Sequence, residues 1–376
     1  MTEWLFDGRQ LVLRMACAAV LGFLIVVMLS PRMIRFLIQR KLGDRPEFDH
    51  AGVNELTRHK SATPTMGGVL IVLAIGVSVL LFADIGNMYV RVSFLVLLWL
   101  GGVGGVDDWL KLRAGSIAAR SDGQAPPSRD GLRMWEKLVF QIALPVLIAN
   151  FIYNYGRISG HVDFEGRLIN AAHNFYFPFK ADPVELGLLA YVIITVLVMV
   201  GSSNAVNLTD GMDGLASGCM VFVTGVFLIL SWVAGNQNWA DFLHLPFVPQ
   251  AAELAVVCAS MIGACIGFLW YNCLPAQMFM GDTGSLPLGG LIGYIAVVTR
   301  HELTLFIVSG VFVMEAASVI TQVLYFKATG GRRIWLCTPI HHHFHLLGWA
   351  ESKVVVRFWL LGALFAAAAL ATLKLR

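Results

Sequence analysis

Long apolar runs recur along the whole chain, and short polar segments separate them. Each run approaches the roughly 20 residues that a helix needs to cross a bilayer. In lipid every backbone polar group must be satisfied internally, so runs of this length predict helices. We therefore predict an all-α polytopic membrane protein with about ten transmembrane helices. The expected spans are 11–30, 66–84, 89–106, 136–155, 186–203, 215–234, 251–271, 285–300, 303–326 and 354–373.

Composition agrees with this class, because hydrophobic residues make up 57% of the chain and charged residues only 14%. Both values are far from those of a soluble domain. The first run lacks a small-residue cleavage pattern, so we expect a span rather than a signal peptide. No cysteine pair has metal-site or redox spacing. Residues 1–376 are predicted to form a single integral-membrane domain, and we expect no nucleic-acid partner. The net charge of +3 says little by itself.

Lys and Arg residues concentrate in the loops after the first, third and ninth predicted spans. Short loops rich in these residues remain in the cytoplasm. Both termini should then lie outside. The polar motifs discussed below occupy the same loops, so they should face the cytoplasm.

Five carboxylates lie at ends of apolar runs: Asp107, Asp108, Asp210, Asp213 and Asp282. Carboxylates beside hydrocarbon usually hold a cation, move a proton or have a partner. Their gathering at one membrane face predicts a site for a metal and a phosphorylated substrate.

Adjacent helical residues point about 100° apart, so Asp107 and Asp108 should divide their roles. One would bind metal or take a proton while the other braces the loop; a solvated helix end is the alternative. Asn204, Asn207, Asp210 and Asp213 are spaced three apart and would share a face if the segment is helical. A structural turn is the alternative there.

Asp282 precedes a predicted span, where it could cap the helix or provide an oxygen ligand for Mg²⁺. Phe279 could stack on a planar base. The adjacent residues His341, His342 and His343 fall in a predicted loop, where they could contact phosphates or form a polar surface. Glu315, inside the ninth run, is either a structural hydrogen-bonding group or part of the pocket floor.

Five motifs carry a resemblance to a known family. They are Lys60–Gly68 (KSATPTMGG), Asp107–Lys111 (DDWLK), Asn204–Ala216 (NAVNLTDGMDGLA), Phe279–Leu286 (FMGDTGSL) and Pro339–Phe344 (PIHHHF). In this order the chain resembles the phospho-N-acetylmuramoyl-pentapeptide transferases over nearly its whole length. These belong to the polyprenyl-phosphate N-acetylhexosamine-1-phosphate transferase superfamily.

The resemblance implies a Mg²⁺-dependent reaction in the bacterial inner membrane. UDP-N-acetylmuramoyl-pentapeptide and undecaprenyl phosphate would give lipid I and UMP, the first membrane step of peptidoglycan synthesis. A homodimer is also implied. The alternatives are a sister enzyme that transfers N-acetylglucosamine phosphate, and a transporter. A transporter would place its ionisable groups near the bilayer midplane rather than at one boundary.

The resemblance also implies roles for individual residues. Asp107, Asp108 and Asp282 would be catalytic, with Asp282 a Mg²⁺ ligand. The substrate-binding residues would be Lys60, Thr65, Lys111, Lys137, Asn204, Asn207, Asp210, Asp213, Asn272, Phe279, Gln322, His341, His342 and His343. We favour direct attack by the lipid phosphate with Asp107 as base, and a covalent aspartyl route stays open. The chain departs from the family in a long 113–133 loop and in His345, where an acid is expected.

Overall fold

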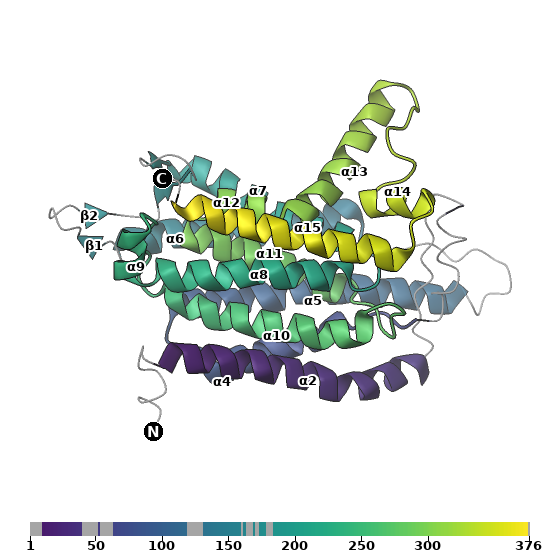
Figure 1. Cartoon of the computed structure of the whole chain (residues 1–376), viewed down its shortest axis with the longest axis horizontal. Helices are drawn as coiled ribbons and strands as arrows, with labels where there is room; N and C mark the ends of the chain where they lie inside the picture. Colours follow the sequence, from purple (N-terminus) through teal and green to yellow (C-terminus); the bar gives the residue numbers. More distant parts are fainter. Residues whose placement is uncertain are drawn as a thin grey trace.

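The computed structural model describes residues 10–39, 52, 63–118, 131–158, 161–162, 168–169, 173–177 and 183–374. Most of these residues are helical, and most of the helices run side by side along one direction (Figure 1). At one end of the bundle α2 begins and α15 ends, near the strands β1 and β2 (Figure 1). The short helix α14 lies at the opposite end (Figure 1).

The longer helices are α2 (Leu11–Gln39), α4 (Gly68–Phe82), α5 (Met88–Ala118), α6 (Met134–Ile158), α7 (Leu188–Thr209), α8 (Leu215–Ala234), α10 (Leu254–Asn272), α11 (Asp282–Thr299), α13 (Gly310–Ala328) and α15 (Glu351–Ala371). The shorter ones are α9 (Gln237–Phe242), α12 (Glu302–Val308), α14 (Ile340–Leu346), and the 3-10 turns η4 (Ala251–Glu253) and η5 (Thr372–Lys374).

Among the described residues, 8 helices are long and apolar enough to cross a membrane. This confirms a polytopic helical membrane protein. The other two predicted spans, 66–84 and 285–300, correspond to the helices α4 and α11. The helix α4 is only 15 residues long, and α11 carries Asp282 and several small residues that lower its hydropathy. The count of about ten therefore stays a prediction.

The predicted span 303–326 is wrong as a continuous helix. It divides into α12 and α13 at Ser309, whose backbone ψ of 23° is outside the helical range. The Ser309 hydroxyl donates to the Leu305 carbonyl at 2.5 Å, a contact that bends helices. Next to it, a Cβ on Gly310 would lie 2.7 Å from the Phe365 ring, so only glycine permits this approach to α15. Beyond the break, α13 leans away from the bundle (Figure 1).

Two further expectations need correction. The chain is not strictly all-α, because the segment between α6 and α7 holds two antiparallel pairs of two-residue strands. They are β1 (His161–Val162) with β2 (Leu168–Ile169), and β3 (Asn174–Phe175) with β4 (Val184–Glu185). The three adjacent histidines were predicted in a loop, yet they lie within the helix α14.

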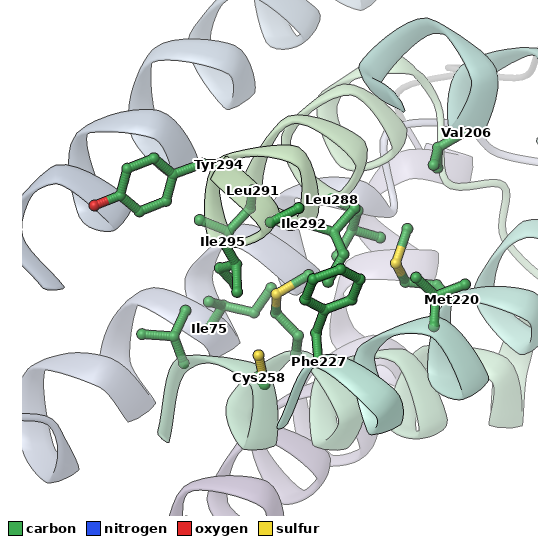
Figure 2. Close-up of a cluster of buried hydrophobic side chains, with 14 of the residues drawn as sticks. Ile75, Val206, Met220, Phe227, Cys258, Leu288, Leu291, Ile292, Tyr294 and Ile295 are labelled. Carbon is green, nitrogen blue, oxygen red and sulfur yellow. The ribbon is translucent and has the colours of Figure 1, made fainter. Parts of the chain in front are cut away.

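The helix α11 is the centre of the bundle, and every one of its residues is buried. Leu288, Leu291 and Ile295 of this helix point into a cluster with Phe227 of α8 and Ile75 of α4 (Figure 2). In a water-soluble protein, burial of such side chains supplies most of the driving force for forming the core. Between helices in a membrane, close packing of the side chains matters more.

Small residues let the backbones of α11 and its neighbours approach closely. A Cβ on Gly293 would lie 3.0 Å from the Met199 Cα of α7, and the Ser202 hydroxyl donates to the Gly289 carbonyl at 2.7 Å. At the start of α11, Gly284 is packed against Gly68 of α4, and the Asp282 carbonyl is packed against Gly104 of α5. The glycines thus bring α4, α5 and α11 together where the acidic residues lie.

Candidate active site

Three of the predicted acids meet at the start of α11. One oxygen each of Asp107, Asp108 and Asp282 lies within 4.8 Å of the others, and all three residues are buried. Asp107 and Asp108 come from α5, and Asp282 is the first residue of α11. Carboxylates this close repel one another unless cations or hydrogen-bond donors offset their charge.

Asp108 is held by the beginning of α11. Its Oδ1 accepts the Asp282 amide at 3.1 Å, while its Oδ2 accepts the Thr283 amide at 2.9 Å and the Thr283 hydroxyl at 2.6 Å. Free amides at a helix N-terminus favour an anionic partner. Asp108 is therefore the residue that braces α11 and fixes the backbone of Asp282.

The turn before α11 needs glycine. Gly281 has a φ of +71°, and a Cβ there would lie 2.6 Å from Asp108 Oδ2 and 3.1 Å from the Thr65 hydroxyl. The Gly281 amide donates to the carboxylate of Asp210, which brings a fourth acid beside the set. A side chain at position 281 would push these groups apart.

Two lysines lie between Asp107 and Asp282. The Lys111 ammonium is 2.8 Å from Asp107 Oδ2 and 3.2 Å from Asp282 Oδ2. Lys137 pairs with the same Asp282 oxygen and is 3.7 Å from Asp107. The remaining oxygen, Asp107 Oδ1, accepts the Leu132 amide at 2.7 Å. With all three acids ionised, the two ammonium groups would leave this cluster with one net negative charge.

Asp282 is the acid of this cluster whose pKa is lowered. Burial favours the protonated form, but the hydrogen bond with Asp107 and the two ammonium charges outweigh it, so the pKa of Asp282 lies well below its usual range. Its Oδ1 also accepts the Asn207 amide at 2.6 Å, and Asn207 donates to the Ser285 hydroxyl at 2.9 Å. Asn207 therefore orients Asp282 from α7.

The donor set fits a hard divalent cation. Its ligating atoms are carboxylate oxygens, which Mg²⁺ and Ca²⁺ prefer, and they lie close enough to share one ion. The residues that could hold a metal are Asp107, Asp108 and Asp282. Asp108 is engaged by backbone amides of α11, whereas Asp107 and Asp282 pair with lysine ammonium groups that a cation could replace.

The segment between α7 and α8 is not helical at Asp210 and Asp213, so the predicted shared face does not form. Helix α7 ends at Thr209, and Gly214 adopts a left-handed φ of 78° before α8. Asp213 instead braces a neighbouring loop, since its Oδ2 accepts the Ala276 amide at 2.9 Å. Asn204 also lies apart, because its amide donates to Gln141 of α6 at 2.9 Å.

Asn272 and Gln322 join backbone segments. Asn272 accepts the Gly214 amide at 3.0 Å and donates to the Met278 carbonyl at 2.9 Å, so it ties two loops together. Gln322 accepts the Ile334 and Trp335 amides at 2.9 and 3.1 Å and donates to the Trp335 carbonyl at 3.1 Å. Both residues hold loops in place rather than presenting free amide groups.

The remaining predicted residues lie around this centre. The Phe279 backbone pairs on both sides with the segment that carries Thr65: its amide donates to Pro64 and its carbonyl accepts from Gly67, each at 2.8 Å. His341 and His342 are buried, and His343 Nδ1 accepts the Leu336 amide at 3.2 Å. Lys60 and positions 119–130 of the long loop lie outside the described residues.

Sequence reasoning missed several residues that organise the site. Thr283 and Ser285 bind acidic or amide groups of the cluster, and Glu351 accepts the Asp213 amide at 3.0 Å. The side-chain oxygen of Gln141 accepts a hydrogen bond from the side-chain amide of Asn204. Glu351 and Gln141 each stand beside an apolar run, which was a usable signal, because polar residues at such places tend to have partners.

The environment of Asp210 predicts a pH-dependent stability. Burial, and then the charges of Asp282 and Asp108, raise the pKa of Asp210 well above its usual range. A carboxyl with a raised folded-state pKa contributes stability below its unfolded pKa, and that contribution is lost as pH rises through the folded pKa. Asparagine cannot ionise. The Asp210→Asn variant should therefore gain stability relative to wild type as pH rises.

Thermal unfolding of both purified proteins in metal-free buffer at about pH 5 and about pH 8 measures this effect. We expect the difference in Tm to move in favour of the variant at the higher pH. A difference that stays the same at both pH values would contradict a proton-retaining Asp210.

Comparison with known proteins defines the class. Residues 90–300 match the model of glycosyl transferase family 4. Residues 60–72 match signature 1 of the phospho-N-acetylmuramoyl-pentapeptide-transferases. This bundle of apolar helices with its buried acidic site is thus a membrane-bound transferase of glycosyl transferase family 4.

Curated relatives narrow the class to one family. The chain is 43% identical over 368 residues to the phospho-N-acetylmuramoyl-pentapeptide-transferase of Desulfotalea psychrophila, covering 98% of this chain and 95% of the relative. It is 40% identical over 363 residues to that of Rickettsia akari, covering 96% and 93%. The chain belongs to the phospho-N-acetylmuramoyl-pentapeptide-transferase family, whose members serve peptidoglycan synthesis.

Proposed function

We propose that this protein transfers phospho-N-acetylmuramoyl-pentapeptide from its UDP derivative to undecaprenyl phosphate, giving lipid I and UMP. The observation that carries the proposal is the group of three buried acids, Asp107, Asp108 and Asp282, with two lysines at the start of α11. Family membership supplies the two substrates. The sister reaction with N-acetylglucosamine phosphate is the competing function.

The protein has about ten spans in this proposal, with α4 and α11 added to the eight long apolar helices. It resides in the bacterial inner membrane with both termini outside and the acidic site facing the cytoplasm. Basic loops support this orientation. The soluble nucleotide would arrive from the cytoplasm, and the lipid phosphate lies at the same boundary. The family resemblance adds a homodimer to the proposal.

Charge neutralisation and alignment are the main requirements of phosphoryl transfer. Lys111 and Lys137, which now pair with Asp107 and Asp282, would turn to the substrate phosphates when these enter. Asp282, together with Asp107, would hold Mg²⁺, which supplies charge stabilisation at the phosphate oxygens. Asp210 would border the nucleoside, and His341 would lie near the diphosphate and sugar.

Two routes use the same residues. In direct attack, Asp107 takes a proton from the lipid phosphate, which then displaces UMP. In the covalent route an aspartate carboxylate attacks first, releasing UMP before the lipid arrives. We favour direct attack. The wild-type protein, given nucleotide without lipid, should then release no stoichiometric burst of UMP, and a labelled phospho-sugar on the chain would establish the covalent route.

Release of UMP tests the function. Purified protein is incubated with UDP-N-acetylmuramoyl-pentapeptide, undecaprenyl phosphate and Mg²⁺, and UMP and the lipid product are measured. We expect product only when all three are present. Turnover with UDP-N-acetylglucosamine, and none with the muramoyl nucleotide, would assign the protein to the sister reaction.

Phe279 should support binding of the nucleotide base. Its backbone is fixed on both sides by the Pro64–Gly67 segment, and its side chain is half-buried beside the acidic set. Loss of a stacked base costs about 1–3 kcal/mol in other proteins. Phe279→Ala should therefore raise the KM for the nucleotide by roughly 5- to 100-fold. The KM for the lipid should be unchanged, and a rise confined to the lipid KM would place Phe279 elsewhere.

A further inference from the structure

A buried carboxylate–imidazole pair joins α13 to α14. Glu315 lies within the candidate span Gly310–Ala328 and is 0% exposed. Its Oε2 is 3.1 Å from Nδ1 of His341, whose side chain is also fully buried. A carboxylate inside a membrane helix is costly unless a partner offsets its charge. The imidazole of His341 is that partner.

The other edge of the His341 ring faces the loop between α7 and α8. A Cβ built on Gly211 would lie 2.5 Å from Nε2 and 2.9 Å from Cε1 of His341. Gly211 directly follows Asp210, whose carboxylate accepts the Gly281 amide beside Asp282. The ring therefore reaches from the Glu315 carboxylate to the loop that borders the acidic set.

Orientation of this ring depends on Glu315. The two nitrogens of a neutral imidazole differ, and a carboxylate at one of them decides which carries the proton. In the part of the chain that the structure describes, no hydrogen-bond donor satisfies bonding geometry at either Glu315 oxygen, so the 3.1 Å contact with His341 Nδ1 is its principal polar contact. The His342 ring, with its centroid 4.2 Å away, packs against the His341 ring edge-on.

We propose that Glu315 is a positioning residue for the transfer reaction and acts only through His341. It holds Nδ1 of His341 toward α13, so that Nε2 is presented to the Asp210–Gly214 loop beside the reacting phosphates. This inference rests on the proposed transferase function. Glu315 itself touches no substrate.

The variants Glu315→Gln, His341→Gln and the double variant test the proposal. Glutamine keeps the size of Glu315 but can turn an NH₂ group toward Nδ1, which favours the opposite tautomer. The corresponding Asp→Asn change beside a histidine base in serine proteases is severe. We expect Glu315→Gln to lower kcat about 10- to 100-fold while the nucleotide KM stays within about twofold.

If Glu315 acts only through His341, the double variant should be no slower than the slower single variant. Ser318→Ala is the matched control, because Ser318 lies on the same helix, is buried, and donates only to the Glu315 backbone carbonyl in the described contacts. Its kcat should equal that of wild type. Losses that multiply in the double variant, or full turnover of Glu315→Gln, would overturn the proposal.

A second measurement needs no turnover. Diethyl pyrocarbonate modifies exposed imidazole nitrogens, and mass spectrometry locates the modified histidine. We expect modification of His341 to be about threefold or more faster in Glu315→Gln than in wild type or Ser318→Ala, because the ring is no longer held. An unchanged rate would show that Glu315 does not fix the ring. Failure of the wild type to release UMP would refute the proposed function and leave this test of the pair intact.

Discussion

Replacing Asp282 by asparagine should leave a folded protein that is almost inactive. Asp282 binds Lys111, Lys137 and Asn207 in the free protein, and it is the acid on which a cation would rest. An amide oxygen is a weaker ligand for a hard cation than a carboxylate oxygen. Loss of such an electrostatic group costs about 10²-fold or more in turnover. Release of UMP across a Mg²⁺ titration measures the effect.

Asp241→Asn is the matched control, because Asp241 is an exposed acid of α9, distant in sequence from the acidic set. It should retain wild-type turnover and an unchanged Mg²⁺ dependence. If Asp282→Asn kept near-normal turnover at low Mg²⁺, the cation would have to rest elsewhere.

Asp108→Asn should damage both stability and activity, unlike a change at its neighbour. Asp108 accepts three hydrogen bonds from Asp282 and Thr283, and an amide would turn a donor toward these donors. A lost helix cap with an unsatisfied buried group costs about 1–3 kcal/mol. The start of α11 should then shift, so that turnover falls at least about tenfold as the geometry of Asp282 is lost.

The variant Asp107→Asn separates a role in bracing α11 from a role in catalysis. The Leu132 amide can still donate to an asparagine oxygen at position 107, so the Tm should stay close to that of wild type. Turnover should nevertheless fall, because the proposed base and one partner of Lys111 are gone. Equal losses of Tm in the two variants, measured by thermal unfolding in the same detergent, would show that Asp108 does not brace α11.

Sequence alone predicted the helices where the hydropathy pattern has clear limits. The predicted span 215–234 coincides with α8, which lies between Gly214 and Gly235. It could not predict the break at Ser309, because apolar residues continue on both sides. That break depends on a hydroxyl that bonds within its own helix and on the approach of Gly310 to Phe365. Both are properties of packing.

The acidic set was predictable because charge beside hydrocarbon is rare. The separate roles of its three acids could not be predicted from the sequence. Asp107 and Asp108 are equivalent by spacing, and only the position of the α11 amides makes Asp108 the brace. Likewise, the repeated three-residue spacing from Asn204 to Asp213 suggested one shared helix face, whereas neighbouring helices and loops provide a separate partner for each of these two residues. Such partners come from distant parts of the chain.

The contact between glycines at the start of α11 limits what a mutational scan of this protein can reveal. Cβ atoms at Gly68 and Gly104 would collide with backbone atoms of Gly284 and Asp282, which no side-chain rotation can relieve. Every substitution there should score as deleterious, as severely as loss of an acid. A map of tolerated substitutions would therefore make these glycines look like catalytic residues, although they serve only to let the helices approach closely. Pairing such a map with abundance measurements would separate the two kinds of position, because a glycine variant disappears from the membrane whereas Asp282→Asn stays.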